Sequence, residues 1–269
     1  MEDLFAIAEF PRSAKYHPEW IKAGISGGAN PLWITEWLAQ ALDLRPGMRV
    51  LDLGCGRALS SIFLHREFGL QVWAVDLLCS VSENLQRIRH AGIDQGVFPL
   101  RADARTLPFG ADFFDAIVSI DSFFYYGTDD LYLNELIRFI KPGGQIGIAG
   151  AGLMKEIVAR VPEHLNDWWT PDLWCLHSAP WWKRHWERTG LMDIEVADSL
   201  AEGWRLWHQW HLAIAPDNKI EIDTLASDAG RYLGYTRLVG RKRAGVVSTE
   251  PILSISTQYT QAPLLRSPE

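Results

Sequence analysis

The stretch that decides the fold is Val50-Leu51-Asp52-Leu53-Gly54-Cys55-Gly56-Arg57-Ala58. Residues 50–53 form a short apolar run that a glycine ends, which is typical of a buried parallel strand. Gly54 allows a tight turn, and Gly56 lets the backbone approach a ligand without a side chain in the way. Residues 58–68 then show apolar positions at helical spacing. A strand that turns on glycines into a helix predicts a nucleotide-binding site at that turn.

Strand-like and helix-like segments alternate on both sides of this motif. Alternation of this kind predicts a parallel sheet covered by helices on both faces, so the expected fold class is α/β, with a doubly wound, mostly parallel, seven-stranded sheet. Helices are expected at 80–90, with Ser80 as N-cap, from Asp129 or Asp130 to 140, at 180–189 and around Trp204, Trp207 and Trp210. The expected strands are 50–53, 71–75, 97–102, 114–120, 145–149, 192–197 and 234–242.

Four regions follow from this order of elements. Residues 1–151 hold N-terminal helices and the binding core, and residues 152–180 interrupt the alternation with tryptophans, prolines and acidic residues. We interpret 152–180 as an inserted, Trp-rich helical lid. Residues 181–243 complete the sheet and contribute a second helical lid element, and residues 244–269 form a C-terminal tail.

Acidic side chains follow two further predicted strands. Asp76 ends the second strand, 20 positions after Gly56, and Asp103 follows the third. Ligands of doubly wound sheets bind beyond the carboxyl ends of the strands, where an acidic residue can accept hydrogen bonds from ribose hydroxyls. A bare strand–helix connection is the alternative for the glycine turn alone. NAD is the rival ligand, but its fingerprint needs a third glycine where Leu59 stands.

These motifs together resemble those of class I S-adenosylmethionine-dependent methyltransferases. The resemblance covers residues 20–150 most strongly, and it points to the small-molecule branch that includes phosphoethanolamine and sarcosine N-methyltransferases and cyclopropane synthases. It implies a Rossmann-like fold and S-adenosyl-L-methionine as the cofactor. The residues that carry it are 50–58, Asp76, 101–109, 113–117 and 136–144.

The resemblance also implies roles for single residues. Asp52, Gly54 and Gly56, with Cys55 between the glycines, would surround the methionine part of the cofactor. Ala58 departs from the family, where many members have a third glycine. Further along, the implied positions are Asp76 and Leu77 at the ribose, Asp103 and Ala104 at the adenine, and Asp121 closing the site after the fourth strand.

The front segment 23–28 resembles a loop of small-molecule N-methyltransferases in which an Ile-Ser pair touches the cofactor. By that match, Ile25 and Ser26 would contact it here. A glycine-rich loop between two helices is the alternative interpretation.

Candidate residues for acceptor chemistry follow the fourth strand. Tyr125 stands about where the phosphoethanolamine enzymes have a histidine, and a tyrosine there could orient a nucleophile by hydrogen bonding. Packing at the edge of the core is the alternative for Tyr125 and Tyr126. His177 and His185 are possible bases, although a lone histidine is more often structural. We take Tyr125, Tyr126 and His177 as the catalytic candidates.

Nine of the 13 tryptophans lie between Trp168 and Trp210. Tryptophan faces attract cations, so a cage for an ammonium acceptor is one interpretation, and a packing surface is the other. We expect 152–180 and the helix around Trp207 to cover the acceptor side of the cofactor. One cavity beside the methyl group would then be lined by Tyr125, Tyr126, Trp168, Trp169 and His177.

Composition limits partners and location. A net charge of −7 disfavours nucleic-acid binding, and Cys55, Cys79 and Cys175 form no C-x-x-C pair, so neither a disulfide framework nor a metal site is expected. Neither a signal peptide nor an apolar run of about 18 residues is apparent, so we expect a cytoplasmic protein without stable membrane association. The oligomeric state stays open.

Three functions remain. The leading one is methyl transfer from S-adenosylmethionine to a nitrogen, oxygen or sulfur atom of a small molecule. The second is lipid modification of the cyclopropane-synthase type, and the third is a regulatory protein that binds the cofactor without catalysis.

Overall fold

A single sheet of seven strands organises the described part of the chain, in the order β3-β2-β1-β4-β5-β7-β6. The computed structural model describes residues 5–25 and 28–246. All seven predicted strands are present in it. Their bounds are β1 Arg49–Leu53, β2 Gln71–Asp76, β3 Val97–Arg101, β4 Phe114–Ile120, β5 Ile140–Leu153, β6 Met192–Ser199 and β7 Leu233–Lys242.

Strand direction confirms the doubly wound, mostly parallel sheet. β1 pairs in parallel with β2 and β4, and β4 pairs in parallel with β5. β7 is antiparallel to both β5 and β6. The strand order reverses between β1 and β4, so the carboxyl ends at Leu53 and Ile120 flank the position where such sheets bind ligands.

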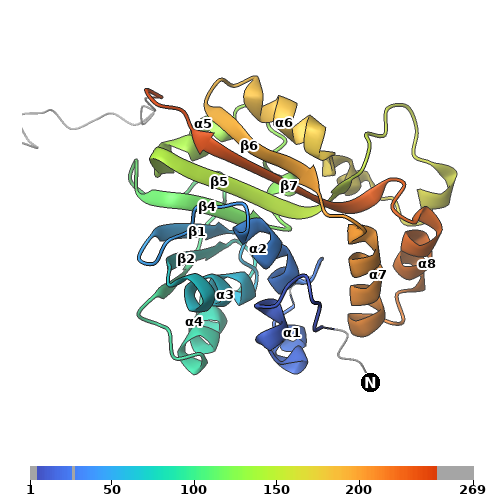
Figure 1. Cartoon of the computed structure of the whole chain (residues 1–269), viewed down its shortest axis with the longest axis horizontal. Coiled ribbons are helices and arrows are strands. Elements are labelled where there is room, and N and C mark those ends of the chain that lie inside the picture. The colour runs from blue at the N-terminus through green and yellow to red at the C-terminus, as the bar shows by residue number, and fades with distance from the viewer. Residues whose placement is uncertain (1–4, 26–27, 247–269) are drawn as a thin grey trace, which may run out of the picture.

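The helices cover the sheet and extend past its end. Residues 154–178, α7 and α8 lie at the same end of the sheet, where β5 ends and β7 begins (Figure 1). α2 packs on α3 and β5, and α6 packs on β6 and β7. The bounds are α1 Pro18–Ala23, α2 Pro31–Ala39, α3 Leu59–Phe68, α4 Val81–His90, α5 Tyr132–Leu136, α6 Ala179–Glu187, α7 Gly203–Ile214 and α8 Lys219–Asp228.

Local capping explains where two helices begin. Ser80 caps α4 as predicted, since its hydroxyl accepts the backbone N–H of Glu83. α3 begins after Ala58, which adopts a left-handed conformation with φ of 63°. Glycine adopts this conformation without strain, so it fits the third glycine that the family resemblance implies at this position.

The structure corrects three expectations about helices. The helix expected from Asp129 or Asp130 is only α5, followed by the 3-10 turn Ile137–Phe139, because β5 already begins at Ile140. Asp129 instead accepts the N–H of Leu131 in a turn before α5. α8 was not predicted. Residues 154–178, within the range 152–180 that was expected to form a helical lid, contain two 3-10 turns, Glu163–Leu165 and Pro171–Cys175, rather than α-helix.

None of the helices in the described residues is long and apolar enough to cross a membrane.

Candidate cofactor and acceptor site

The backbone N–H groups of the glycine turn after β1 form hydrogen bonds to other residues of the protein. The backbone N–H groups of Gly54 and Cys55 both donate to the carbonyl of Val75, at 2.8 and 3.0 Å. The N–H of Gly56 donates to Oδ2 of Asp76 at 2.9 Å. A pyrophosphate is held by free amide groups at such a turn, and three consecutive amides here are already engaged. The turn therefore suits a nucleoside ligand that carries no phosphate.

Asp76 shapes this turn as well as facing the ligand side. Its Oδ1 accepts the N–H groups of Leu78 and Cys79, both at 2.8 Å, and its Oδ2 accepts the N–H of Gly56 at 2.9 Å. A carboxylate oxygen offers about two lone pairs, so Oδ2 keeps one for a ribose hydroxyl. Leu77, the predicted neighbour at the ribose, is 44% exposed.

Asp52 lies beneath the turn and is fully buried. The hydroxyls of Ser60 and Ser61 both donate to its Oδ2 at 2.6 Å, while its Oδ1 has no hydrogen-bond partner in the described residues. Burial raises the pKa of Asp52 to about 6. An unpartnered acceptor beside the turn fits the ammonium group of a methionine moiety.

Close packing explains the first glycine of the motif. Gly54 has φ of 77°, and a Cβ atom there would collide with the hydroxyl of Ser122. Only glycine therefore fits between the β1 turn and the segment after β4. Cys55 beside it is buried, and burial raises the pKa of its thiol.

The third strand end is more open. Oδ1 of Asp103 accepts the N–H of Arg105 at 2.9 Å, and the carbonyl of Ala104 accepts the hydroxyl of Tyr132 at 3.1 Å. The other carboxylate oxygen of Asp103 remains available to a ligand such as an adenine amino group.

Asp121 joins Ala29, which stands shortly before α2, to the sheet. Its Oδ2 accepts the N–H of Ala29 at 2.7 Å, and its Oδ1 accepts the N–H of Ala151 at 2.9 Å. Burial raises the pKa of Asp121. Of the two front-segment candidates, Ile25 packs against the core, and Ser26 lies outside the described residues.

The three catalytic candidates have different surroundings. The hydroxyl of Tyr126 is buried and lies within hydrogen-bond distance of Ser119, Ser122 and the carbonyl of Leu53. Tyr125 is 60% exposed, and the nearby Asp121, Cys175 and Asp172 contribute, after burial, to its raised pKa. The side chain of Tyr126 therefore supports the end of β1, whereas Tyr125 is open to a ligand.

His177 is held by a residue that the sequence pattern did not single out. Its Nδ1 lies 3.0 Å from Oε2 of Glu156, and the ring stacks on Trp181 with centroids 3.5 Å apart. The backbone N–H and the hydroxyl of Ser178 both donate to the other oxygen of Glu156. These bonds lower the pKa of Glu156 against the effect of its burial.

The Trp-rich segments divide between the two faces of the sheet, which corrects the expectation of one shared cavity. Trp168 contacts Trp207 of α7, and Trp207 stacks on Tyr235 of β7. The next residue, Thr236, lies in a small pocket with Trp182 of α6, and successive strand residues point to opposite faces. The stacking of His177 on Trp181 places His177 with the α6 cluster.

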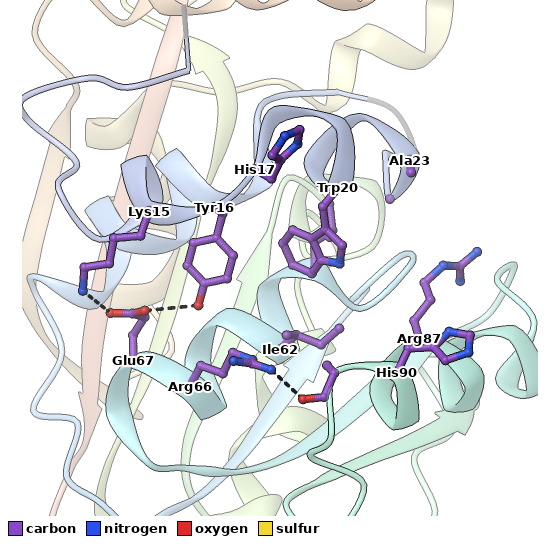
Figure 2. A pocket seen from close by; sticks show the side chains of 13 residues that line it. Lys15, Tyr16, His17, Trp20, Ala23, Ile62, Arg66, Glu67, Arg87 and His90 are labelled. Atoms are coloured by element: carbon purple, nitrogen blue, oxygen red, sulfur yellow. Dashed lines mark hydrogen bonds and ion pairs between the residues drawn. The ribbon is translucent and has the colours of Figure 1, made fainter. Parts of the chain in front are cut away.

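A cavity of about 710 Å³ lies elsewhere, between α1, α3 and α4 (Figure 2). Tyr16 and Trp20 form its aromatic side, and Arg66, Arg87 and His90 contribute its basic groups. None of the predicted site residues lines it. Among the described residues, no group of histidine, cysteine and carboxylate side chains is arranged to hold a metal ion.

Comparisons with known proteins agree with this geometry. Residues 50–144 match the family model described as "Methyltransferase domain". The methyltransferase GfsG of Streptomyces halstedii is 32% identical over 134 residues, which are 48% of each chain. The glycine/sarcosine/dimethylglycine N-methyltransferase of Actinopolyspora halophila is 26% identical over 60% of this chain and 28% of its own. The chain thus spans about half or less of these relatives.

Solved structures share the fold. Phosphoethanolamine N-methyltransferase 2 of Haemonchus contortus, in complex with S-adenosyl-L-methionine, has a TM-score of 0.64 at 20% identity, over 90% of this chain and 59% of that one. Geranyl diphosphate C-methyltransferase of Streptomyces coelicolor A3(2), in complex with S-adenosyl-L-homocysteine, has a TM-score of 0.63 at 20% identity, over 77% and 76%. Residues 50–144 of this chain therefore form a methyltransferase domain.

Proposed function

We propose that this protein transfers the methyl group of S-adenosylmethionine to a small-molecule acceptor. The observation that carries the proposal is the glycine turn, whose three amides are engaged by Val75 and Asp76. This turn stands beside acidic groups at three neighbouring strand ends. The arrangement suits an adenosine joined to an amino acid and leaves no amide cradle for a pyrophosphate.

The chain's own residues bind and orient the cofactor in this proposal. Asp52 accepts the ammonium group through its free Oδ1, Asp76 accepts a ribose hydroxyl through Oδ2, and Asp103 and Ala104 border the adenine. The bound cofactor supplies a methyl group that its sulfonium makes electrophilic. Gly54, Gly56, Cys55, Leu77 and Ile25 contribute surface around it, and Asp121 fixes Ala29 beside the end of β4.

Residues 154–178 and α7 extend past the end of β5 (Figure 1), and this end of the sheet is the proposed side of the acceptor. Tyr125, which is exposed there, is the proposed orienting group among the sequence candidates. His177, held by Glu156, is the proposed second group on the α6 side. The protein's acidic charge favours a cytoplasmic small molecule over a nucleic acid or an anionic membrane.

Calorimetry with S-adenosylhomocysteine and with NAD tests the cofactor part directly. We expect saturable binding of S-adenosylhomocysteine and none of NAD at the same concentration. Tight NAD binding without a response to S-adenosylhomocysteine would overturn the proposal. Transfer of labelled methyl from S-adenosylmethionine to a panel of amines, alcohols and thiols then tests catalysis. A protein that binds the cofactor but methylates no member of the panel is expected only under the regulatory alternative.

A further inference from the structure

The cavity between α1, α3 and α4 has the size of a small-molecule site, although none of the candidate cofactor and acceptor residues lines it (Figure 2). Its volume is about 710 Å³, and sites for small molecules commonly measure about 300–1,000 Å³. Residues 15–24, which include α1, form one wall, and α3 and α4 form the others. The side chains on these walls decide which class of ligand the cavity can bind.

One side of the cavity is aromatic and aliphatic. The ring of Trp20 points from α1 towards Ile62 of α3 (Figure 2), and it contacts the ring of Tyr16 with centroids 5.3 Å apart. Trp20 is only half-buried, and Leu59 and Ile62 line the cavity with it. Aromatic and apolar side chains of this kind form favourable contacts with a planar ring.

The charged residues give the cavity a positive charge. Its basic lining residues are Lys15, Arg66 and Arg87, and Glu67 is the acidic residue among the described residues that line it. Glu67 already has partners, since its Oε2 lies 3.2 Å from Lys15 Nζ and its Oε1 accepts the hydroxyl of Tyr16 at 3.2 Å. The whole chain has a net charge of −7, so this positive cavity is a local feature that favours an anion.

Arg66 and Arg87 retain N–H groups for a ligand. Nη2 of Arg66 donates to the carbonyl of Ala91, and within residues 5–25 and 28–246 Arg66 forms no ion pair. Arg87 donates to Oδ1 of Asn84 at 2.9 Å. Its ion pair with Glu83 is weakened by solvent, because that glutamate side chain is 64% exposed. A guanidinium has more N–H donors than these bonds use, so both arginines can also bind a carboxylate or phosphate oxygen.

The aromatic side and the basic side lie close to each other. Burial and the Glu67 carboxylate raise the pKa of Tyr16, whereas the positive charge of Arg66 acts to lower it. The guanidinium of Arg66 is therefore near the phenol ring that contacts Trp20. A ring held by Trp20 would have an anionic substituent within the same cavity as Arg66.

We propose that this cavity binds a planar aromatic molecule that carries an anionic oxygen group, at a site separate from that of methyl transfer. The ring lies against Trp20 and Ile62, and Arg66 and Arg87 bind the carboxylate or phosphate. A neutral molecule of the same shape lacks the charge-assisted hydrogen bonds. This inference goes beyond the proposed function and concerns a second ligand.

The cavity adjoins the glycine turn but does not include it. Leu59, which lines the cavity, is the first residue of α3 and directly follows Ala58. Gly24 packs against it, since a Cβ atom at Gly24 would come within 2.6 Å of the Leu59 side chain. Arg57 donates to the carbonyl of Ala23 at 3.4 Å. Because α1 and the start of α3 are in contact here, we expect the second ligand and the cofactor to bind at the same time.

The test uses the full chain and three probes with one ring system, 2-naphthoate, 2-naphthyl phosphate and the neutral 2-naphthol. Calorimetry should show at least one anionic probe binding about tenfold or more tightly than 2-naphthol, because of its hydrogen bonds with charged groups. Comparison of the two anionic probes shows whether a carboxylate or a phosphate is preferred. The same affinities are expected with and without saturating S-adenosylhomocysteine.

Three arginine variants of equal net charge locate the site. Arg66→Gln and Arg87→Gln should each weaken binding of the anionic probe about tenfold and leave binding of 2-naphthol and S-adenosylhomocysteine unchanged. Arg89→Gln is the matched control, because Arg89 also belongs to α4 but does not line the cavity and forms an ion pair with Asp94. It should bind every probe as the parent protein does.

Nuclear magnetic resonance provides a second measurement that needs no loss of binding. The indole N–H resonance of Trp20, identified by its disappearance in Trp20→Phe, should shift when the anionic probe is added. An unshifted Trp20 resonance, equally tight binding of 2-naphthol, an equal loss in Arg89→Gln, displacement of the probe by S-adenosylhomocysteine, or no binding of either anionic probe would overturn this inference. Probe binding without S-adenosylhomocysteine binding would instead overturn the proposed function and leave this inference standing.

Discussion

Oδ2 of Asp76 accepts the backbone N–H of Gly56 at 2.9 Å, which joins the end of β2 to the glycine turn after β1. The same carboxylate is therefore part of the turn's structure and part of the proposed ribose site. Doubly wound sheets commonly place an acidic residue at this strand end. Here Asp76 also binds the Gly56 N–H group that would otherwise be available to a phosphate.

Asp76→Asn should weaken S-adenosylhomocysteine binding about 10- to 100-fold, because a hydrogen bond to a charged group contributes about 1.5–3 kcal/mol. The loss includes the misplaced amide, since the side-chain NH₂ would face either Gly56 or Leu78. Calorimetry measures the affinity, and circular dichroism checks the fold. Asp94→Asn is the control, because Asp94 forms an exposed ion pair with Arg89 away from the turn. An unchanged dissociation constant for Asp76→Asn would remove Asp76 from the ribose site.

The pH dependence of the free energy of unfolding should show the raised pKa of Asp52. Its folded-state pKa of about 6 lies above the ordinary 3.8. The stability from protonated Asp52 is therefore fully present below pH 3.8 and is lost as the pH rises through about 6. The difference amounts to about 3 kcal/mol at alkaline pH.

Asp52→Asn should therefore be more stable than the parent protein at pH 8, and this advantage should shrink towards pH 4. Urea unfolding of both proteins at the two pH values, without cofactor, measures the difference. An equal difference at both pH values would show that Asp52 has an ordinary pKa.

The two adjacent tyrosines should respond differently to loss of the hydroxyl. Tyr126→Phe should lower the free energy of unfolding by about 1–2 kcal/mol, because it removes buried hydrogen bonds with Ser119 and Leu53. Tyr125→Phe should change stability by less than about 0.5 kcal/mol, since Tyr125 is largely exposed. Denaturant unfolding of both variants measures the two changes in the free energy of unfolding. Equal losses would contradict the assignment of Tyr126 to the core.

Arg237 should contribute more to stability than an exposed arginine does. Its guanidinium binds both carboxylate oxygens of Asp198, at 3.0 and 2.6 Å, donates to the carbonyl of Trp37 and lies over the Trp37 ring. Arg237→Ala should cost about 2 kcal/mol, because it removes a bidentate pair and a link between α2 and β7. Arg243→Ala, which removes an exposed pair with Asp193, should cost less than about 0.5 kcal/mol. Thermal and urea unfolding of both variants check this, and equal losses would count against the link.

Local patterns determined the sheet. The fourth strand was expected at 114–120 and is Phe114–Ile120, because a mostly apolar run of this length is typical of a buried central strand. The glycine turn and the N-cap at Ser80 were also predictable, since both depend on the conformational preferences of neighbouring residues. The 3-10 turns within 154–178 and helix α8 were harder to predict, because each has few apolar positions.

Tertiary structure alone decided the partners within the site. Asp121 was expected to close the site, but its bonds to Ala29 and Ala151, 92 and 30 residues away, depend on the path of the whole chain. The same holds for Glu156 beside His177 and for Tyr235 beside Trp207. A strand residue's face depends on register and a helix residue's neighbour on packing angle, and both are settled only when distant segments bury their apolar surfaces together.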